Sequence, residues 1–123
     1  MEPKQAAFDI INNASDGPAT ILAADWWCYR PIQYLAYQRP DFEVLLCRKP
    51  EGQSIDVTTP RRRFFVAFAG GTSEAWMMKH APELPRTEIV DYSGRPVLYV
   101  WDLGTATELL SGVIEAAGSE PAD

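Results

Sequence analysis

The sequence is poor in the residues that bind transition metals. It contains one histidine, His80, and two cysteines, Cys28 and Cys47, which do not form a C-x-x-C pair. A structural zinc site needs four such ligands at close spacing, so this composition excludes one. The two cysteines can pair in an oxidising compartment or remain as buried thiols, and the sequence favours the thiols. We expect neither a metal nor a cofactor.

Long apolar segments and positive charge are also scarce. No stretch approaches the length that spans a bilayer, and residues 1–5 lack the apolar core of a signal peptide, so we expect the chain as given to be soluble. The formal net charge is -6, and the only basic run is Arg61-Arg62-Arg63. We interpret that run as a solvated strand entry rather than a patch for phosphates or lipid headgroups. A nucleic-acid partner is not expected for so acidic a chain.

Three well-known catalytic or nucleotide-binding patterns are missing. The sequence contains no G-x-S-x-G, no G-x-G-x-x-G and no P-loop with its lysine. It therefore predicts no α/β-hydrolase triad and gives little support to a dinucleotide or nucleoside triphosphate site. His80, close to Pro82, fits an exposed residue at a helix end.

The hydrophobic pattern predicts one α/β domain over residues 1–117, followed by a disordered tail at 118–123. Strands separated by helices imply right-handed parallel crossovers. The expected fold is a three-layer Rossmann-like sandwich with a mostly parallel sheet and an antiparallel C-terminal hairpin at its edge. The expected elements are a helix at 3–14, a strand at 20–24, a helix from Pro31 to about Tyr37, and strands at 42–47 and 63–69. A helix after 70–74, paired strands at 87–92 and 96–101, and a final helix follow; the final helix begins with a Thr105–Glu108 capping box and buries Leu109, Leu110, Val113 and Ile114. Residues 49–62 are loop-like, with a short edge strand at 55–57 as the alternative.

The first candidate site directly follows the strand at 20–24. It contains Asp25, Trp26, Trp27 and Arg30. As a ligand wall, the aromatic rings would stack on a sugar or cover a lipid chain, Arg30 would bind an anionic group, and Asp25 a hydroxyl. In a purely structural role, one Trp fills the core, the other covers the helix, and Asp25 caps it. The sequence leaves both roles open.

The second candidate site is the turn formed by Gly70, Gly71, Thr72 and Ser73, between the central strand and a helix. Backbone amides at a helix start can bind a phosphate. The simpler interpretation, in which Thr72 or Ser73 is an ordinary helix cap, is favoured.

Two segments carry a resemblance to a known family. Residues 25–36, DWWCYRPIQYLA, resemble the W-W-x-Y-x-P-x-x-Y-L-A stretch near the C-terminus of bacterial membrane glycosyltransferases of the dolichyl-phosphate-mannose mannosyltransferase type. Residues 91–100, DYSGRPVLYV, look like the D-x-x-G-R-P-V-L-x-V hairpin that closes the same region. The resemblance covers most of the span from Ile10 to Trp101.

The resemblance implies a non-catalytic, C-terminal extracytoplasmic domain of a larger bacterial membrane protein. In that family the catalytic acidic residues lie in a loop of the transmembrane part, which takes a sugar from a polyprenyl-phosphate donor, and nothing here matches that loop. The implied role is to bind or position a glycan or a lipid-linked sugar acceptor, with Trp26, Trp27 and Arg30 as contacts. The transmembrane part of the parent protein would be a partner.

Two other functions remain open. One is a free-standing small α/β enzyme or binding protein that acts on a phosphorylated metabolite through Gly70–Ser73 and Asp25. The other is an interaction module that buries Trp26, Trp27 and Trp76 in a protein interface.

Overall fold

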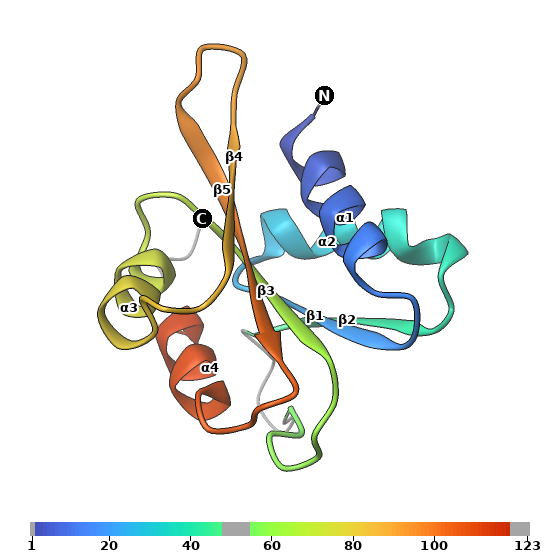
Figure 1. Cartoon of the computed structure of the whole chain (residues 1–123). Coiled ribbons are helices and arrows are strands. Elements are labelled where there is room, and N and C mark those ends of the chain that lie inside the picture. The colour runs from blue at the N-terminus through green and yellow to red at the C-terminus, as the bar shows by residue number, and fades with distance from the viewer. Residues whose placement is uncertain (1, 48–54, 119–123) are drawn as a thin grey trace.

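The computed structural model of the chain describes residues 2–47 and 55–118 (Figure 1). This part contains both helices and strands. The helices are α1 (Pro3–Ala14), α2 (Trp26–Leu35), the 3₁₀ turn η1 (Ala36–Gln38), α3 (Thr72–His80) and α4 (Leu110–Gly118). The strands are β1 (Ala19–Ala23), β2 (Phe42–Leu46), β3 (Arg63–Phe68), β4 (Arg86–Val90) and β5 (Pro96–Gly104). Two pairs of strands, β2 with β3 and β4 with β5, follow each other with no helix among the described residues between them. None of the helices in the described ranges has the length and apolar content needed to cross a bilayer.

The strands form one open sheet in the order β2-β1-β3-β5-β4. β1 is parallel to both β2 and β3, whereas β5 is antiparallel to both β3 and β4. Four strands therefore point in one direction and β5 in the other, so the sheet is mostly parallel, as the sequence predicts. The antiparallel hairpin of β4 and β5 is present, but it does not simply add an edge, because β5 lies inside the sheet and only β4 lies at its border.

Helices cover both faces of the sheet, giving an α/β sandwich (Figure 1). Side chains alternate between the two faces along a strand, so Phe64 and Val66 of β3 pack under α1 and α2. Phe65 and Ala67 point to the other face, toward α3 and α4. The central strand is buried on both sides, which explains its continuous apolar sequence. The β2-β1-β3 half has the strand order of a doubly wound sheet, and the antiparallel β5 departs from it.

Helix α2 begins five residues earlier than the sequence predicts. It starts at Trp26, because the carboxylate of Asp25 caps it by accepting a hydrogen bond of 2.9 Å from the amide of Cys28. Pro31 consequently lies inside the helix instead of in its first turn. Proline has no amide hydrogen, so the carbonyl of Trp27 lacks its usual helical donor.

The predicted capping box of Thr105 and Glu108 is wrong. Strand β5 continues to Gly104, whose positive φ of 63° reverses the chain, and a turn follows before α4. Helix α4 begins at Leu110, whose amide donates to the carbonyl of Thr107 at 3.2 Å. Two of the predicted core residues of this helix, Leu110 and Val113, are buried. The other two, Leu109 and Ile114, pack partly against the core.

Two further predictions concern less regular segments. Residues 55–57 form a loop rather than the alternative edge strand, although Ile55 and Val57 pack against the core beside α3 and α4. The predicted tail begins at Gly118, which is the last residue of α4, and its remaining residues lie outside the described part of the chain.

Candidate functional site

The two predicted site segments follow neighbouring strands. β1 and β3 are parallel and adjacent, and a backbone hydrogen bond of 3.0 Å joins the amide of Ala24 to the carbonyl of Val66. After β1 the chain enters α2 on one face, and after β3 it enters α3 on the other. Both segments therefore lie at the same edge of the sheet, where open α/β sheets form crevices. They nevertheless lead to helices on opposite faces.

In the turn from Gly70 to Ser73, a side chain of the protein itself already binds a backbone amide. Gly71 holds the cap position of α3, so neither Thr72 nor Ser73 is the cap that the sequence suggested. The carboxylate of Glu74 accepts a hydrogen bond of 2.5 Å from the amide of Gly70. Ser73 is fully buried. Among the described residues no side chain caps α3, but the Glu74 carboxylate lies at this helix start and would repel a phosphate, so the local geometry favours a structural turn over an anion site.

Asp25 has the structural role that the sequence offered as one of two interpretations. It is half-buried, and its carboxylate caps α2 through the amide of Cys28. The structural interpretation of Asp25 therefore holds, with the donor placed earlier in the chain than the sequence suggested. Cys28 is buried beneath it, and Cys47 is buried on the other face of the sheet; both are thiols rather than a disulfide.

The two tryptophans are exposed, so the interpretation that one fills the core is wrong. Trp26 is 52 % and Trp27 is 55 % exposed. The Trp26 ring lies 5.7 Å from the Tyr29 ring, and the guanidinium of Arg30 lies 5.3 Å from the Trp26 centroid. These contacts hold the ring and the cation in place on the surface of α2 without burying either of them.

Further aromatic side chains continue this surface along the helix. Tyr34 and Tyr37 are 81 % and 85 % exposed. The side-chain oxygen of Gln33 accepts from Arg30 at 3.3 Å, and its amide nitrogen donates to the Tyr29 hydroxyl at 2.8 Å. We call this surface the aromatic face; it comprises Trp26, Trp27, Arg30, Gln33, Tyr34 and Tyr37. The opposite side of α2 packs into the core through Cys28 and Ile32.

A groove runs beside the aromatic face, between α1 and the C-terminal half of α2 with η1. Its volume is about 860 Å³, within the range of small-ligand sites. It is lined by Gln5, Phe8, Arg30, Pro31, Gln33, Tyr34, Leu35, Tyr37 and Gln38. Of these, the sequence predicted only Arg30 as a site residue. Tyr34 and Tyr37 stand four and seven residues after Arg30, which is the spacing of one helix face and was the available signal.

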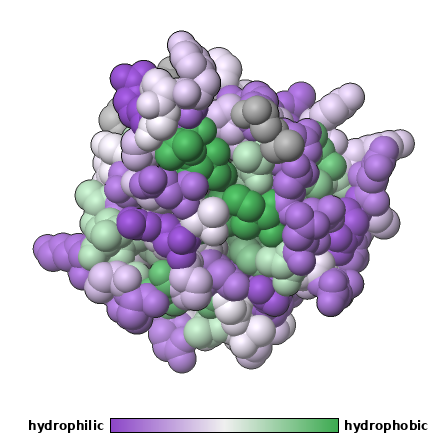
Figure 2. Space-filling model, turned by 45° about the horizontal axis from the view of Figure 1, so that its top comes forward, coloured by the Kyte–Doolittle hydropathy of each residue, from purple (hydrophilic) through white to green (hydrophobic). Residues whose placement is uncertain are grey.

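Apolar surface is also exposed outside the aromatic face. Figure 2 shows hydrophobic residues (green) in the middle of the surface brought forward from the top of Figure 1, with hydrophilic residues (purple) around them. In the described part of the chain, the other exposed large hydrophobic side chains are Met78, Val90 and Tyr92. These come from α3, β4 and the hairpin turn, whereas the aromatic face gathers four rings on one continuous segment. The aromatic face is the stronger candidate.

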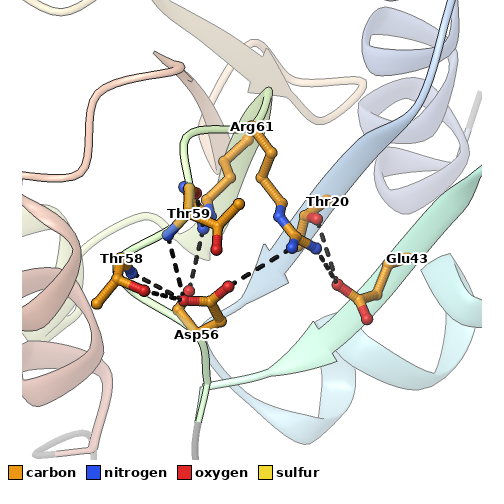
Figure 3. Close-up of polar contacts among 7 residues, drawn as sticks. Thr20, Glu43, Asp56, Thr58, Thr59 and Arg61 are labelled. Carbon is orange, nitrogen blue, oxygen red and sulfur yellow. Dashed lines mark hydrogen bonds and ion pairs between the residues drawn. The ribbon is translucent and has the colours of Figure 1, made fainter.

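A polar cluster lies at the other end of the sheet, where β1, β2 and β3 begin (Figure 3). Arg61 lies 3.5 Å from the carboxylates of both Glu43 and Asp56. Asp56 also accepts hydrogen bonds from the Thr58 amide and hydroxyl and from the Thr59 amide. Hydrogen bonds from the Thr59 side chain and from the amide and hydroxyl of Thr58 hold the pKa of Asp56 far below its usual value.

The arginine run at 61–63 is not uniformly solvated, which corrects the expectation for its last member. Arg63 is 1 % exposed, and it donates to the carbonyls of Asp56 and Thr59 at 3.0 Å each. Burial lowers its pKa. The cluster therefore uses its own acids, hydroxyls and carbonyls to fix the segment that enters β3. These contacts indicate a structural role for the cluster.

Residues 2–47 and 55–118 contain no group of three or more His, Cys, Asp or Glu side chains placed to hold a metal ion. The His80 ring stacks on Trp76 at a centroid distance of 4.5 Å, at the end of α3.

Comparison with known proteins found no matching family model, no matching curated protein and no matching solved structure. The function must therefore be inferred from the side chains themselves.

Proposed function

We propose that this chain is a non-catalytic glycan-binding domain, and that it forms the extracytoplasmic C-terminal part of a bacterial membrane glycosyltransferase, where it binds or positions a sugar or lipid-linked sugar acceptor. The observation that carries the proposal is the exposure of four aromatic side chains on one helix face beside a groove. Of the two segments that resemble such transferases, residues 25–36 form α2 with its cap, and residues 91–100 form the turn between β4 and β5 and the first half of β5.

The aromatic face is not needed for the packing of α2. The helix contacts the core through Cys28 and Ile32, while Trp26 and Trp27 remain half in water. Leaving about 100 Å² of an aromatic side chain exposed forgoes roughly 2 kcal/mol of burial free energy. A chain that does so at four neighbouring positions gains most when a ligand covers them.

The groove chemistry suits a sugar better than an apolar partner. A pyranose ring presents a flat face of C–H groups, which stacks on aromatic rings, and a rim of hydroxyls, which need donors and acceptors. Tyr34 and Tyr37 supply the rings and phenolic hydroxyls. Three glutamine side chains and one guanidinium supply polar groups around them, and Leu35 is the only branched aliphatic residue among the lining.

The glycan-binding part is tested by titrating the chain with a panel of soluble oligosaccharides and following tryptophan fluorescence. Dissociation constants from millimolar to micromolar are expected, which correspond to roughly -4 to -8 kcal/mol. The variants Tyr34→Ala and Trp26→Ala should weaken binding at least tenfold. Tyr92→Ala is the matched control, because Tyr92 is an exposed tyrosine in the hairpin turn and does not line the groove. Absence of binding, or binding that ignores these variants, would contradict the proposal.

The parent-protein part requires a separate measurement. An antibody raised against this chain would be used to blot fractionated source cells. A membrane-bound band well above 13.7 kDa would support a domain of a larger transferase. A band of 13.7 kDa outside the membrane fraction would contradict that part and leave glycan binding to be judged on its own.

A further inference from the structure

Among the described residues, Arg30 has no carboxylate partner, as is also the case for Arg63 and Arg86, whereas Arg39, Arg61, Arg62 and Arg95 form ion pairs. The ion pairs include Arg39 with Asp41 at 3.0 Å and Arg62 with Asp102 at 2.8 Å. Within residues 2–47 and 55–118, no carboxylate lies within 4.0 Å of the Arg30 guanidinium. Its contacts are the side-chain oxygen of Gln33 and the ring of Trp26. The result is an uncompensated cation on the surface of an acidic chain.

The position of Arg30 gives this cation a specific setting. It is the only charged residue among those that line the groove. The Trp26 ring and the Gln33 oxygen restrict the guanidinium, so less side-chain entropy is lost when it binds a ligand. Only one of its N–H donors is used by Gln33, and the others can form the paired hydrogen bonds that a carboxylate or phosphate accepts.

The aromatic face extends on both sides of Arg30. Trp26 and Trp27 precede it, and Tyr34 and Tyr37 follow it. Tyr37 stands eleven positions after Trp26, which corresponds to about 16 Å along a helix. That length exceeds a single sugar ring and provides two aromatic surfaces with a cation between them.

We infer that the aromatic face binds an acidic oligosaccharide, with an oxyanion of the glycan held by Arg30 between two aromatic subsites. This inference rests on the proposed glycan binding and specifies its ligand class. The oxyanion is a uronate carboxylate or a phosphate on the sugar, since both accept the same fork of guanidinium donors. The net charge of -6 does not oppose this locally, because exposed charges beyond about 10 Å are largely screened at 0.1 M salt.

Calorimetric titration of the chain with two matched pairs of probes tests the inference. The first pair is trigalacturonate and its fully methyl-esterified form, and the second is maltotriose and maltotriose phosphate. Within each pair the members differ in charge and share the same sugar backbone. We expect the charged member of at least one pair to bind tenfold or more tightly than its neutral counterpart. The pair that shows the preference identifies the source of the oxyanion.

Substitutions at Arg30 then assign the preference to this residue. Arg30→Gln should remove the preference for the charged probe, so that the charged and neutral members of the pair bind this variant with affinities within twofold of each other. Arg30→Lys should restore only part of it, because an ammonium group cannot form the paired hydrogen bonds. Arg95→Gln is the charge-matched control, since Arg95 is exposed in the hairpin turn and does not line the groove.

The outcomes separate this inference from the proposed function. Equal binding of charged and neutral probes, or a preference that survives Arg30→Gln, overturns the acidic ligand and leaves glycan binding intact. Failure of every saccharide in the panel overturns both. Phosphatidylcholine and phosphatidylglycerol vesicles are included, and binding of the chain to vesicles but not to saccharides would also overturn both in favour of a lipid surface.

Discussion

The residue Asp25 stands between the end of β1 and the aromatic face, and its carboxylate caps α2 through the amide of Cys28. Asp25→Ala should lower the free energy of unfolding by about 1 kcal/mol, because the loss of a helix cap leaves an amide unsatisfied. Asp25→Asn should retain most of the stability. Urea denaturation measures both, with Glu83→Ala as a control that removes the same charge from an exposed turn. A loss of glycan affinity without a loss of stability would instead make Asp25 a ligand contact.

Asp56 gives the polar cluster a defined dependence on pH. Its pKa is lowered in the folded state, so its contribution to stability is fully present above the unfolded pKa near 4 and is lost as the pH falls further. Asp56→Asn should therefore unfold at a lower temperature than the wild type at pH 7. The difference in Tm should shrink steadily below pH 4. A difference that stays constant from pH 7 to pH 2 would show that the carboxylate charge is not what stabilises the cluster.

The aromatic face shows how far single residues can be interpreted without a structure. The adjacent Trp26 and Trp27 beside Arg30 led to the prediction of a site at this place in the chain, and the structure shows that both rings are exposed there. Their exposure was not predictable, because the same residues fill a core equally well. Once α2 is known to begin at Trp26, the helical spacing places Tyr34 and Tyr37 on the same face as Trp26 and Arg30. The groove is also lined by Gln5 and Phe8 of α1, and residues 25–37 alone do not predict that α1 packs beside them.

At the scale of elements, the hydrophobic patterns predicted which segments are helices and strands, but the residues typical of helix starts predicted wrong boundaries. Pro31 suggested a helix start because proline is common in the first turn, yet the cap by Asp25 begins the helix earlier. The Thr105 and Glu108 pattern fits a capping box, but β5 extends through Gly104 and delays α4. The position of β5 between β3 and β4 depends on pairing between distant segments, which local sequence does not encode.

The contact between α3 and α4 depends on a glycine. A Cβ atom placed on Gly112 would clash with the ring of Trp76, so either the indole or the helices must shift to admit a side chain there. Gly112→Ala should destabilise the protein by about 1–3 kcal/mol, the usual cost of overpacking a well-packed contact. The opposite sign is expected at Gly118 in the same helix, where a Cβ meets nothing within 4 Å and alanine favours the helix.

A double variant identifies the cause of that destabilisation. Trp76→Leu should remove most of the clash, so the cost of Gly112→Ala should be smaller in the Trp76→Leu background than in the wild type. Urea denaturation of the four proteins gives the coupling free energy. Additive effects would show that the indole ring does not limit the approach of the two helices.

At the scale of the whole molecule, the sheet is shared by two apolar layers. Cys28 lies in the layer under α1 and α2, and Cys47 lies in the layer beside α3 and α4. Both layers are built on the same strands, since Phe64 and Phe65 are consecutive residues that point to opposite faces. Separation of one layer from the sheet would therefore expose the back of the other. We expect the domain to unfold as one cooperative unit.

The two thiols report on that cooperativity directly. The variants Cys28→Ala and Cys47→Ala each leave one buried thiol, and its reaction with a disulfide reagent in dilute urea measures the free energy of the opening that exposes it. We expect the two variants to give the same opening free energy, equal to that of global unfolding. A much faster reaction of Cys47 than of Cys28 would show that β2, which pairs only with β1, opens on its own. Because Phe42 and Val44 of β2 pack in the layer under α1 and α2, such an opening would also loosen the layer that supports the aromatic face.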